Sequence, residues 1–92
     1  MRIYLACFDI EDDRQRRKLG DLLLEYGDRV QHSVFEIALP DQMPLDTLRQ
    51  RCLRYVGEQD SLRFYWLNDL SRSQSVDAWG QGIARYPQGV VL

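Results

Sequence analysis

The sequence predicts an α+β domain of the ferredoxin-like type, in which both helices cover one face of an antiparallel sheet. A chain of 92 residues has room for one domain only. Strand and helix patterns follow each other in the order β-α-β-β-α-β, and a tail completes the chain. No internal repeat, low-complexity tract or flexible linker divides it. We therefore expect a single domain over residues 1–92, with 87–92 as a candidate interface tail.

The first two elements have the clearest patterns. Residues 3–8 are an unbroken apolar run, typical of a central strand that is covered on both faces. Asp12 or Asp13 can cap the following helix, and Gln15 lies in capping-box position relative to Asp12. The apolar stripe of this helix consists of Leu19, Leu22, Leu23 and Tyr26. Gly27 follows the stripe, at the C′ position where helices commonly end on glycine.

The middle of the chain predicts a strand and a second helix. Residues 29–39 read as one long strand, but the apolar alternation changes phase near Val34, which indicates a bulge or a sharp bend. Pro40 and Pro44 close this strand and open the helix. The core stripe of the helix consists of Leu45, Leu48, Cys52 and Val56, and Gly57 lies past its end.

The last third predicts further strands and an interface. Residues 61–67 form a strand with bulky side chains on both faces, 75–80 a weaker fourth strand, and 89–92 a short terminal strand. Because the helices cover one face only, a twofold homodimer packed sheet against sheet would cover the other. We expect Phe35, Ile37 and the aromatic residues of 61–67 in this interface, with the terminal strand pairing across the dimer.

Composition restricts the class of protein. The net charge of −2 does not indicate a nucleic-acid binder by itself. Lys18 is the only lysine among 12 basic residues, and arginine presents a planar donor fork that suits phosphate, although a genome rich in G and C gives the same bias. No apolar run approaches the roughly 20 residues of a membrane span, and the start of the chain lacks the pattern of a signal peptide. Cys7 and Cys52 lie in apolar segments without metal-ligand spacing, so we expect a reduced, cytoplasmic protein.

Motifs of the common enzyme classes are missing from the sequence. It contains no GxGxxG, GxxxxGK[ST], HExxH or GxSxG pattern. His32 is the only histidine, and we interpret it as a sheet-face or interface residue in preference to a catalytic base. Small-molecule dehydrogenase, P-loop and zinc-protease chemistry are thereby disfavoured.

Two features are candidates for chemistry. Asp9 ends the first strand, and carboxylates at strand ends commonly take part in metal binding or acid–base work; the alternative is an aspartate that only forms the turn. A basic cluster follows on the first helical turns, where cations oppose the helix dipole. It either neutralises the neighbouring acidic residues or binds phosphate. Its members are Arg14, Arg16, Arg17 and Lys18.

Two segments of the chain resemble the CRISPR adaptation protein family Cas2. The first is Tyr4–Arg16, an apolar strand that ends in Phe-Asp-Ile and continues into Asp-Asp and a basic helix start. The second is Tyr26–Glu36, with a glycine followed by Arg-Val-Gln and then Ser-Val-Phe. Together they cover roughly the first 40 residues, and the remainder agrees in architecture.

The resemblance implies a homodimer that acts in spacer acquisition for antiviral defence, together with the larger adaptation protein Cas1. It implies a metal-dependent endonuclease that hydrolyses phosphodiester bonds in RNA or duplex DNA. Asp9 matches the family's metal-binding aspartate, for Mg²⁺ or Mn²⁺, while Arg16, Lys18, Arg29 and Phe35 match its activity-linked positions. Mg²⁺ prefers six oxygen ligands, and a single Asp9 carboxylate supplies too few of them. Two copies of Asp9 across a twofold axis, together with waters and a phosphate oxygen, would complete the ligand set.

Three alternatives remain open at this stage. The dimer can be a non-catalytic scaffold that bridges Cas1 dimers and holds protospacer duplex DNA through the same arginines. An RNA-recognition domain is less favoured, because residues 61–67 lack the glycine-aromatic run of such domains. A regulatory dimer that binds a small molecule is compatible with the fold alone.

Overall fold

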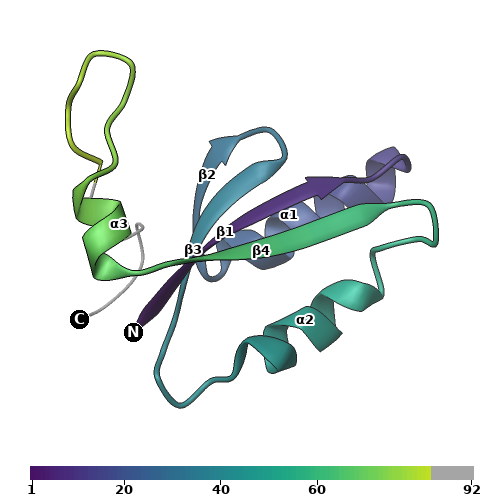
Figure 1. Cartoon of the computed structure of the whole chain (residues 1–92). Helices are drawn as coiled ribbons and strands as arrows, with labels where there is room; N and C mark the ends of the chain where they lie inside the picture. Colours follow the sequence, from purple (N-terminus) through teal and green to yellow (C-terminus); the bar gives the residue numbers. More distant parts are fainter. Residues whose placement is uncertain (84–92) are drawn as a thin grey trace.

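The computed structural model of the chain describes residues 1–83 (Figure 1). The helices and strands of this part are β1 (Arg2–Asp9), α1 (Asp13–Leu24), β2 (Gly27–Gln31), β3 (Val34–Leu39), α2 (Leu45–Leu53), β4 (Ser61–Leu67) and α3 (Asp69–Ser73). Residues 87–92, the candidate interface tail with its terminal strand, lie outside the described residues. Within residues 1–83, no helix is long and apolar enough to cross a membrane.

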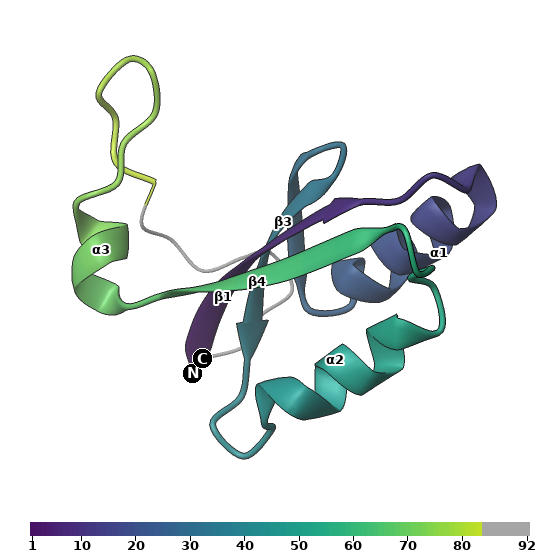
Figure 2. The same cartoon turned by 45° about the vertical axis from the view of Figure 1, so that its right-hand side comes forward.

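The four strands form one antiparallel sheet in the order β2-β3-β1-β4. The central strand β1 pairs with β3 on one side and with β4 on the other. Both long helices lie on the same side of the sheet (Figures 1 and 2). The predicted α+β, ferredoxin-like architecture is therefore confirmed.

The hydrophobic core fills the space between the sheet and the two helices. Alternate residues of β1, namely Tyr4, Ala6 and Phe8, are buried there, as strand periodicity requires. Phe35 from β3 is fully buried and stacks on Phe8, with the ring centroids 5.8 Å apart. The helices contribute Leu19, Leu22 and Leu23 from α1 and Leu48 and Cys52 from α2. The predicted helix stripes thus form the core, where burying each large apolar side chain contributes about 1.5–3 kcal/mol.

The change of phase near Val34 is a hairpin turn. His32 and Ser33 form the turn, Gln31 pairs with Val34, and the register shifts between Arg29 and Gln31. The prediction of one long strand over 29–39 is therefore wrong. Among the described residues no side-chain-bearing residue has positive φ, so this turn needs no glycine and the sequence carries no signal for it.

Gly27 has a different role from the predicted one. Helix α1 ends at Glu25, a cap residue in the right-handed conformation, and Gly27 is the first residue of β2. A Cβ atom on Gly27 would lie 2.0 Å from the backbone oxygen of Glu36. The glycine is therefore required by the close approach of β2 to β3 and does not cap the helix.

Residues 69–83 form a projection that we call the arm. It consists of α3 and the loop after it, and projects beyond the end of β4, away from α1 and α2 (Figures 1 and 2). The strand predicted over 75–80 is wrong: a single bridge joins Val76 to Gly82 around a turn. The carboxylate of Asp77 accepts the backbone N–H groups of Trp79 and Gln81, at 2.9 and 3.0 Å, and this local bonding replaces a strand.

The sheet face away from α1 and α2 is called the open face. It carries the other alternate residues of the strands, including Leu5, Cys7 and Asp9 of β1 and Tyr65 of β4. Phe35 and Ile37 point to the opposite side and are fully buried under the helices. The expectation that these two residues cover the open face is wrong, because the alternation restarts after the turn at His32 and Ser33.

Candidate functional site

Asp9 is the last residue of β1 and is exposed. Strand alternation places it on the open face, at the edge of the sheet where its register partner is Ser61 of β4. In the part of the chain that the structure describes, its carboxylate accepts no hydrogen bond. The interpretation of Asp9 as a purely turn-forming aspartate therefore has no support from its contacts.

Other carboxylates form the turn next to Asp9. The side chain of Asp12 accepts the backbone N–H of Gln15 at 2.9 Å and caps α1, as predicted. Asp60 joins two loops, since it accepts the N–H of Glu11 at 3.1 Å and the N–H of Gly57 at 2.7 Å. These bonds fix the loop that leaves Asp9 without using Asp9 itself.

A shallow acidic groove lies beside this loop. It is lined by Glu11, Asp12, Asp13, Gly57, Glu58, Gln59 and Asp60. Among residues 1–83, no three or more His, Cys, Asp or Glu side chains are placed so that they could hold a metal ion. Because Mg²⁺ requires about six oxygen ligands, Asp9 of one protomer can contribute to a magnesium site only together with ligands from outside that protomer.

Arg16 of the basic cluster is engaged within the protein. Its Nε donates to the carbonyl of Ile10 at 3.2 Å, its Nη2 donates to the carbonyl of Glu11 at 3.3 Å, and it forms an ion pair with Asp13. These contacts hold the loop after Asp9 against the start of α1. Arg16 thus positions the Asp9 loop, and its role as a phosphate ligand stays a prediction.

Arg14 and Arg17 are the exposed members of the cluster. They are three residues apart and share the outer face of α1, opposite the buried stripe. Lys18 is half-buried beside them. Within residues 1–83, none of these three cations forms an ion pair. Their positive charges are therefore available to a polyanion.

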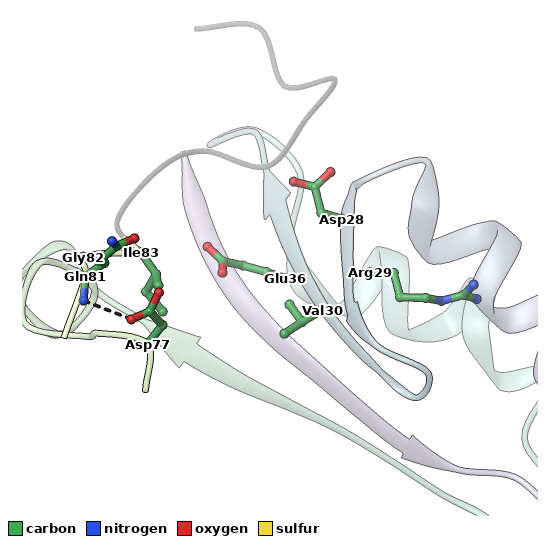
Figure 3. Close-up of a pocket in the computed structure, with 8 residues that line it drawn as sticks. All are labelled: Asp28, Arg29, Val30, Glu36, Asp77, Gln81, Gly82 and Ile83. Atoms are coloured by element: carbon green, nitrogen blue, oxygen red, sulfur yellow. Dashed lines mark hydrogen bonds between the residues drawn. The ribbon is translucent and has the colours of Figure 1, made fainter. Parts of the chain in front are cut away.

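Arg29 and Phe35 form a contact pair at the edge of the core. The guanidinium carbon of Arg29 lies 5.0 Å from the centre of the Phe35 ring, a cation–π geometry. The side chain extends towards α1, where a Cβ on Gly20 would come within 2.8 Å of its Nη2 (Figure 3). Phe35 is fully buried in this protomer, so it can influence activity only through packing and through the position of Arg29.

Sequence reasoning missed an ion pair between β3 and the arm. Arg72 of α3 is buried and donates from Nε to Oε1 of Glu36 at 2.9 Å, with Nη2 bound to the same oxygen. The local sequence indicates the start of α3, because Asn68 caps this helix by accepting the N–H of Ser71 at 2.8 Å, but it does not indicate the ion pair. Beside this pair, a groove of about 400 Å³ separates the hairpin of β2 and β3 from the arm (Figure 3). Carboxylates of Asp28, Glu36 and Asp77 line it.

The described features define a class: a small ferredoxin-like protein with an exposed strand-end aspartate and a basic outer face on its first helix. Comparison with known proteins makes the class specific. The family model for "CRISPR associated protein Cas2" matches residues 1–75. The chain therefore belongs to the Cas2 family.

Individual relatives agree with this assignment. A Synechocystis protein named CRISPR-associated endoribonuclease Cas2 3 is 44% identical over 93 residues, covering 100% of this chain and 99% of its own. A Thermus thermophilus CRISPR-associated endonuclease Cas2 2 is 48% identical over 65 residues, which is 70% of this chain and 71% of the relative.

Two solved structures show the extent of the structural similarity. A chain of a partial Cas6-RT-Cas1–Cas2 complex superposes with a TM-score of 0.82 at 38% identity, covering 100% of both chains. Streptococcus pyogenes Cas2, solved at pH 6.5, superposes with a TM-score of 0.61 at 30% identity. That similarity covers 72% of this chain and 86% of the other.

Proposed function

We propose that this protein is a CRISPR adaptation subunit that acts as a homodimer with a Cas1 protein and cleaves RNA or duplex DNA in a metal-dependent reaction at Asp9. The observation that carries the proposal is the exposed Asp9 at the end of the central strand, on the open face, without a hydrogen-bond partner among the described residues. The endoribonuclease and endonuclease names of the Synechocystis and Thermus relatives support the reaction class. The Cas1-containing complex supports the partner.

The open face gives a physical reason for the dimer. Leu5 and Tyr65 are register partners there, and Tyr65 is 47% exposed in the single protomer. Packing two open faces about a twofold axis would bury these apolar groups and bring the two β1 ends, each with its Asp9, into one interface. The pair of carboxylates would then hold Mg²⁺ or Mn²⁺, which polarises a phosphate and lowers the pKa of a bound water.

Arg14 and Arg17 complete the proposed site. Since both are exposed cations on the outer face of α1, they would contact phosphate groups of the bound nucleic acid and hold it on the subunit. Such contacts carry no sequence information, which agrees with a subunit that must accept nucleic acid of any sequence. Arg16 would keep the Asp9 loop in place through its two carbonyl contacts.

The proposal predicts that Asp9→Asn abolishes metal-dependent cleavage while the fold and the dimer persist, because Asp9 is exposed and makes no contact that stabilises the strand. Wild type and variant are compared on single-stranded RNA and duplex DNA with Mg²⁺, Mn²⁺ or EDTA. Asp21→Asn on the outer face of α1 is the matched control, since it removes an exposed carboxylate of the same kind. Equal cleavage by Asp9→Asn and wild type would refute the assignment of the site.

The scaffold role is the second candidate function. One observation favours it: Arg14 and Arg17 are exposed and form no ion pair within residues 1–83, so they can hold phosphate groups without a metal. In this case the dimer would bridge Cas1 dimers and hold protospacer duplex through Arg14 and Arg17, and Asp9 would be dispensable. Spacer integration by Cas1 together with the Asp9→Asn variant, at the wild-type level, would identify the scaffold as the working function.

A further inference from the structure

The position of the Asp9 carboxylate depends on the backbone around it, because within residues 1–83 its side chain forms no hydrogen bond or ion pair. Asp9 is the last residue of β1, and its register partner Ser61 is the first residue of β4. The pairing of the two strands ends at this pair. Since Mg²⁺ demands near-ideal octahedral geometry, a carboxylate that holds it needs a strand end that is fixed by other contacts.

Asp60 connects the two chain segments just beyond the end of this strand pair. Its Oδ1 accepts the backbone N–H of Glu11 at 3.1 Å, and its Oδ2 accepts the N–H of Gly57 at 2.7 Å. Its own N–H donates to the carbonyl of Gly57 at 3.0 Å, which closes a turn before β4. A Cβ on Gly57 would lie 3.0 Å from Oδ2, so the glycine leaves room for the carboxylate. Both oxygens of Asp60 are therefore engaged, one in its own turn and one in the loop after Asp9.

Charged side chains hold the backbone of Glu11 at both of its polar groups. Asp60 accepts from the N–H, and Nη2 of Arg16 donates to the carbonyl at 3.3 Å. Nε of Arg16 also donates to the carbonyl of Ile10 at 3.2 Å, and the Ile10 side chain is buried in the core. Hydrogen bonds to ionised groups are stronger than those between neutral groups. We call these contacts the Glu11 clamp; they fix the two residues after Asp9 to α1 and to the turn before β4.

We propose that Asp60 is a positioning residue for the Asp9 site: together with Arg16 it fixes the Glu11 backbone, and thereby sets the affinity of the paired Asp9 carboxylates for a divalent cation. This inference rests on the proposed function, because it assumes that Asp9 binds the metal. Asp60 acts through the loop and not as a metal ligand, since both of its oxygens accept backbone N–H groups. Its loss should therefore lower the affinity for the cation without changing the groups that react.

The first test measures the Glu11 clamp in the metal-free protein. Asp60→Ala removes both acceptor oxygens, so hydrogen exchange of the Glu11 amide, followed by NMR, should become about tenfold faster. Asp60→Asn replaces one acceptor oxygen by a donor and is the milder variant, which carries both tests if Asp60→Ala does not fold. Glu58→Gln is the matched control: Glu58 lines the same acidic groove, is exposed, and forms no hydrogen bond or ion pair within residues 1–83. Thermal melting and light scattering verify the fold and the dimer.

The second test measures binding of Mn²⁺ by calorimetric titration of the full chain. Asp60→Asn is expected to raise the dissociation constant for Mn²⁺ by about tenfold, the usual loss when a group that orients a metal ligand is removed. Glu58→Gln removes the same charge from the same groove and should leave the dissociation constant close to that of wild type. At saturating Mn²⁺, cleavage should recover in Asp60→Asn but not in Asp9→Asn, because only the second variant lacks a ligand.

The outcomes separate this inference from the proposed function. If wild type binds Mn²⁺ no better than Asp9→Asn, the metal site is refuted, and the role of Asp60 with it. If wild type binds Mn²⁺ through Asp9 and Asp60→Asn binds it equally well, only the role of Asp60 is overturned. Equal losses in Asp60→Asn and Glu58→Gln would assign the effect to charge, and weaker binding without faster exchange at Glu11 would contradict the clamp; either result overturns the inference.

Discussion

The two cysteines lie in different environments. Cys52 of α2 is fully buried in the core, and this burial raises the pKa of its thiol from 9.0 to about 11, because the interior penalises the charged thiolate. Cys7 is half-buried on the open face. Sequence patterning placed both in apolar segments, but only the alternation of β1 determines that Cys7 faces away from the helices.

We predict that the raised pKa of Cys52 makes stability depend on alkaline pH. The neutral thiol is favoured in the folded state, so its contribution is fully present below pH 9 and is lost as the pH rises towards 11. Urea unfolding between pH 8 and 11 should therefore show a steeper fall in the free energy of unfolding for wild type than for Cys52→Ala. At pH 8, a thiol reagent should modify Cys7 before Cys52. Equal slopes for the two proteins would contradict the prediction.

The elements differ in how much of them the sequence determines. Helix α1 was predictable because Asp12 and the buried stripe act locally, within a few residues of each other. The hairpin between β2 and β3 was not, because the turn at His32 and Ser33 uses ordinary backbone angles and no turn-specific residue. Helix α3 depends on a long-range contact, the ion pair of Arg72 with Glu36, which local patterns do not contain.

The candidate site likewise combines features that the local sequence determines with features that depend on the path of the chain. Asp9 was predictable, since a strand end follows from the apolar run before it. The separate roles of Arg16 and its neighbours were not, because the loop carbonyls that bind Arg16 are placed by the chain's path after β1. The expectation for Phe35 failed for a related reason: treating 29–39 as one strand left its face undetermined.

At the scale of the hairpin, we predict that Gly27→Ala destabilises the protein by about 1–3 kcal/mol or more, the usual cost of forced overpacking. The added Cβ would lie 2.0 Å from the Glu36 carbonyl oxygen, so β2 must move away from β3. Gly82→Ala is the matched control, because a Cβ there meets no atom within 4 Å. Chemical denaturation of the two variants measures the difference; a Gly27→Ala protein as stable as the control would contradict the close approach.

At the scale of the whole molecule, the helices cover one face of the sheet, whereas the other face keeps apolar side chains accessible. The helices bury one face completely enough that Phe35, Ile37 and Leu39 are inaccessible. The open face keeps Leu5 and Tyr65 accessible in the protomer, so the second copy in the proposed dimer satisfies a need that the fold itself creates.

We predict that Tyr65→Glu converts the dimer to a monomer, because it would place a charge in a buried interface. Leu53→Glu on α2 is the control with the same 47% exposure, and it should leave the dimer intact. Light scattering over a range of protein concentrations measures the mass of each variant. A Tyr65→Glu protein that dimerises as tightly as the control would exclude the open face as the interface.

The exposure of Asp9 has a consequence for how activity can change among proteins of this kind. An exposed residue at the end of a strand, whose side chain forms no hydrogen bond or ion pair within residues 1–83, can be replaced at little cost in stability, whereas Phe35 or Gly27 cannot. A single substitution can therefore silence the chemistry while the fold and the partner surfaces are inherited unchanged. In the proposed function, cleavage and assembly would thus be separable traits, and the loss of cleavage would leave no trace in the architecture that supports assembly.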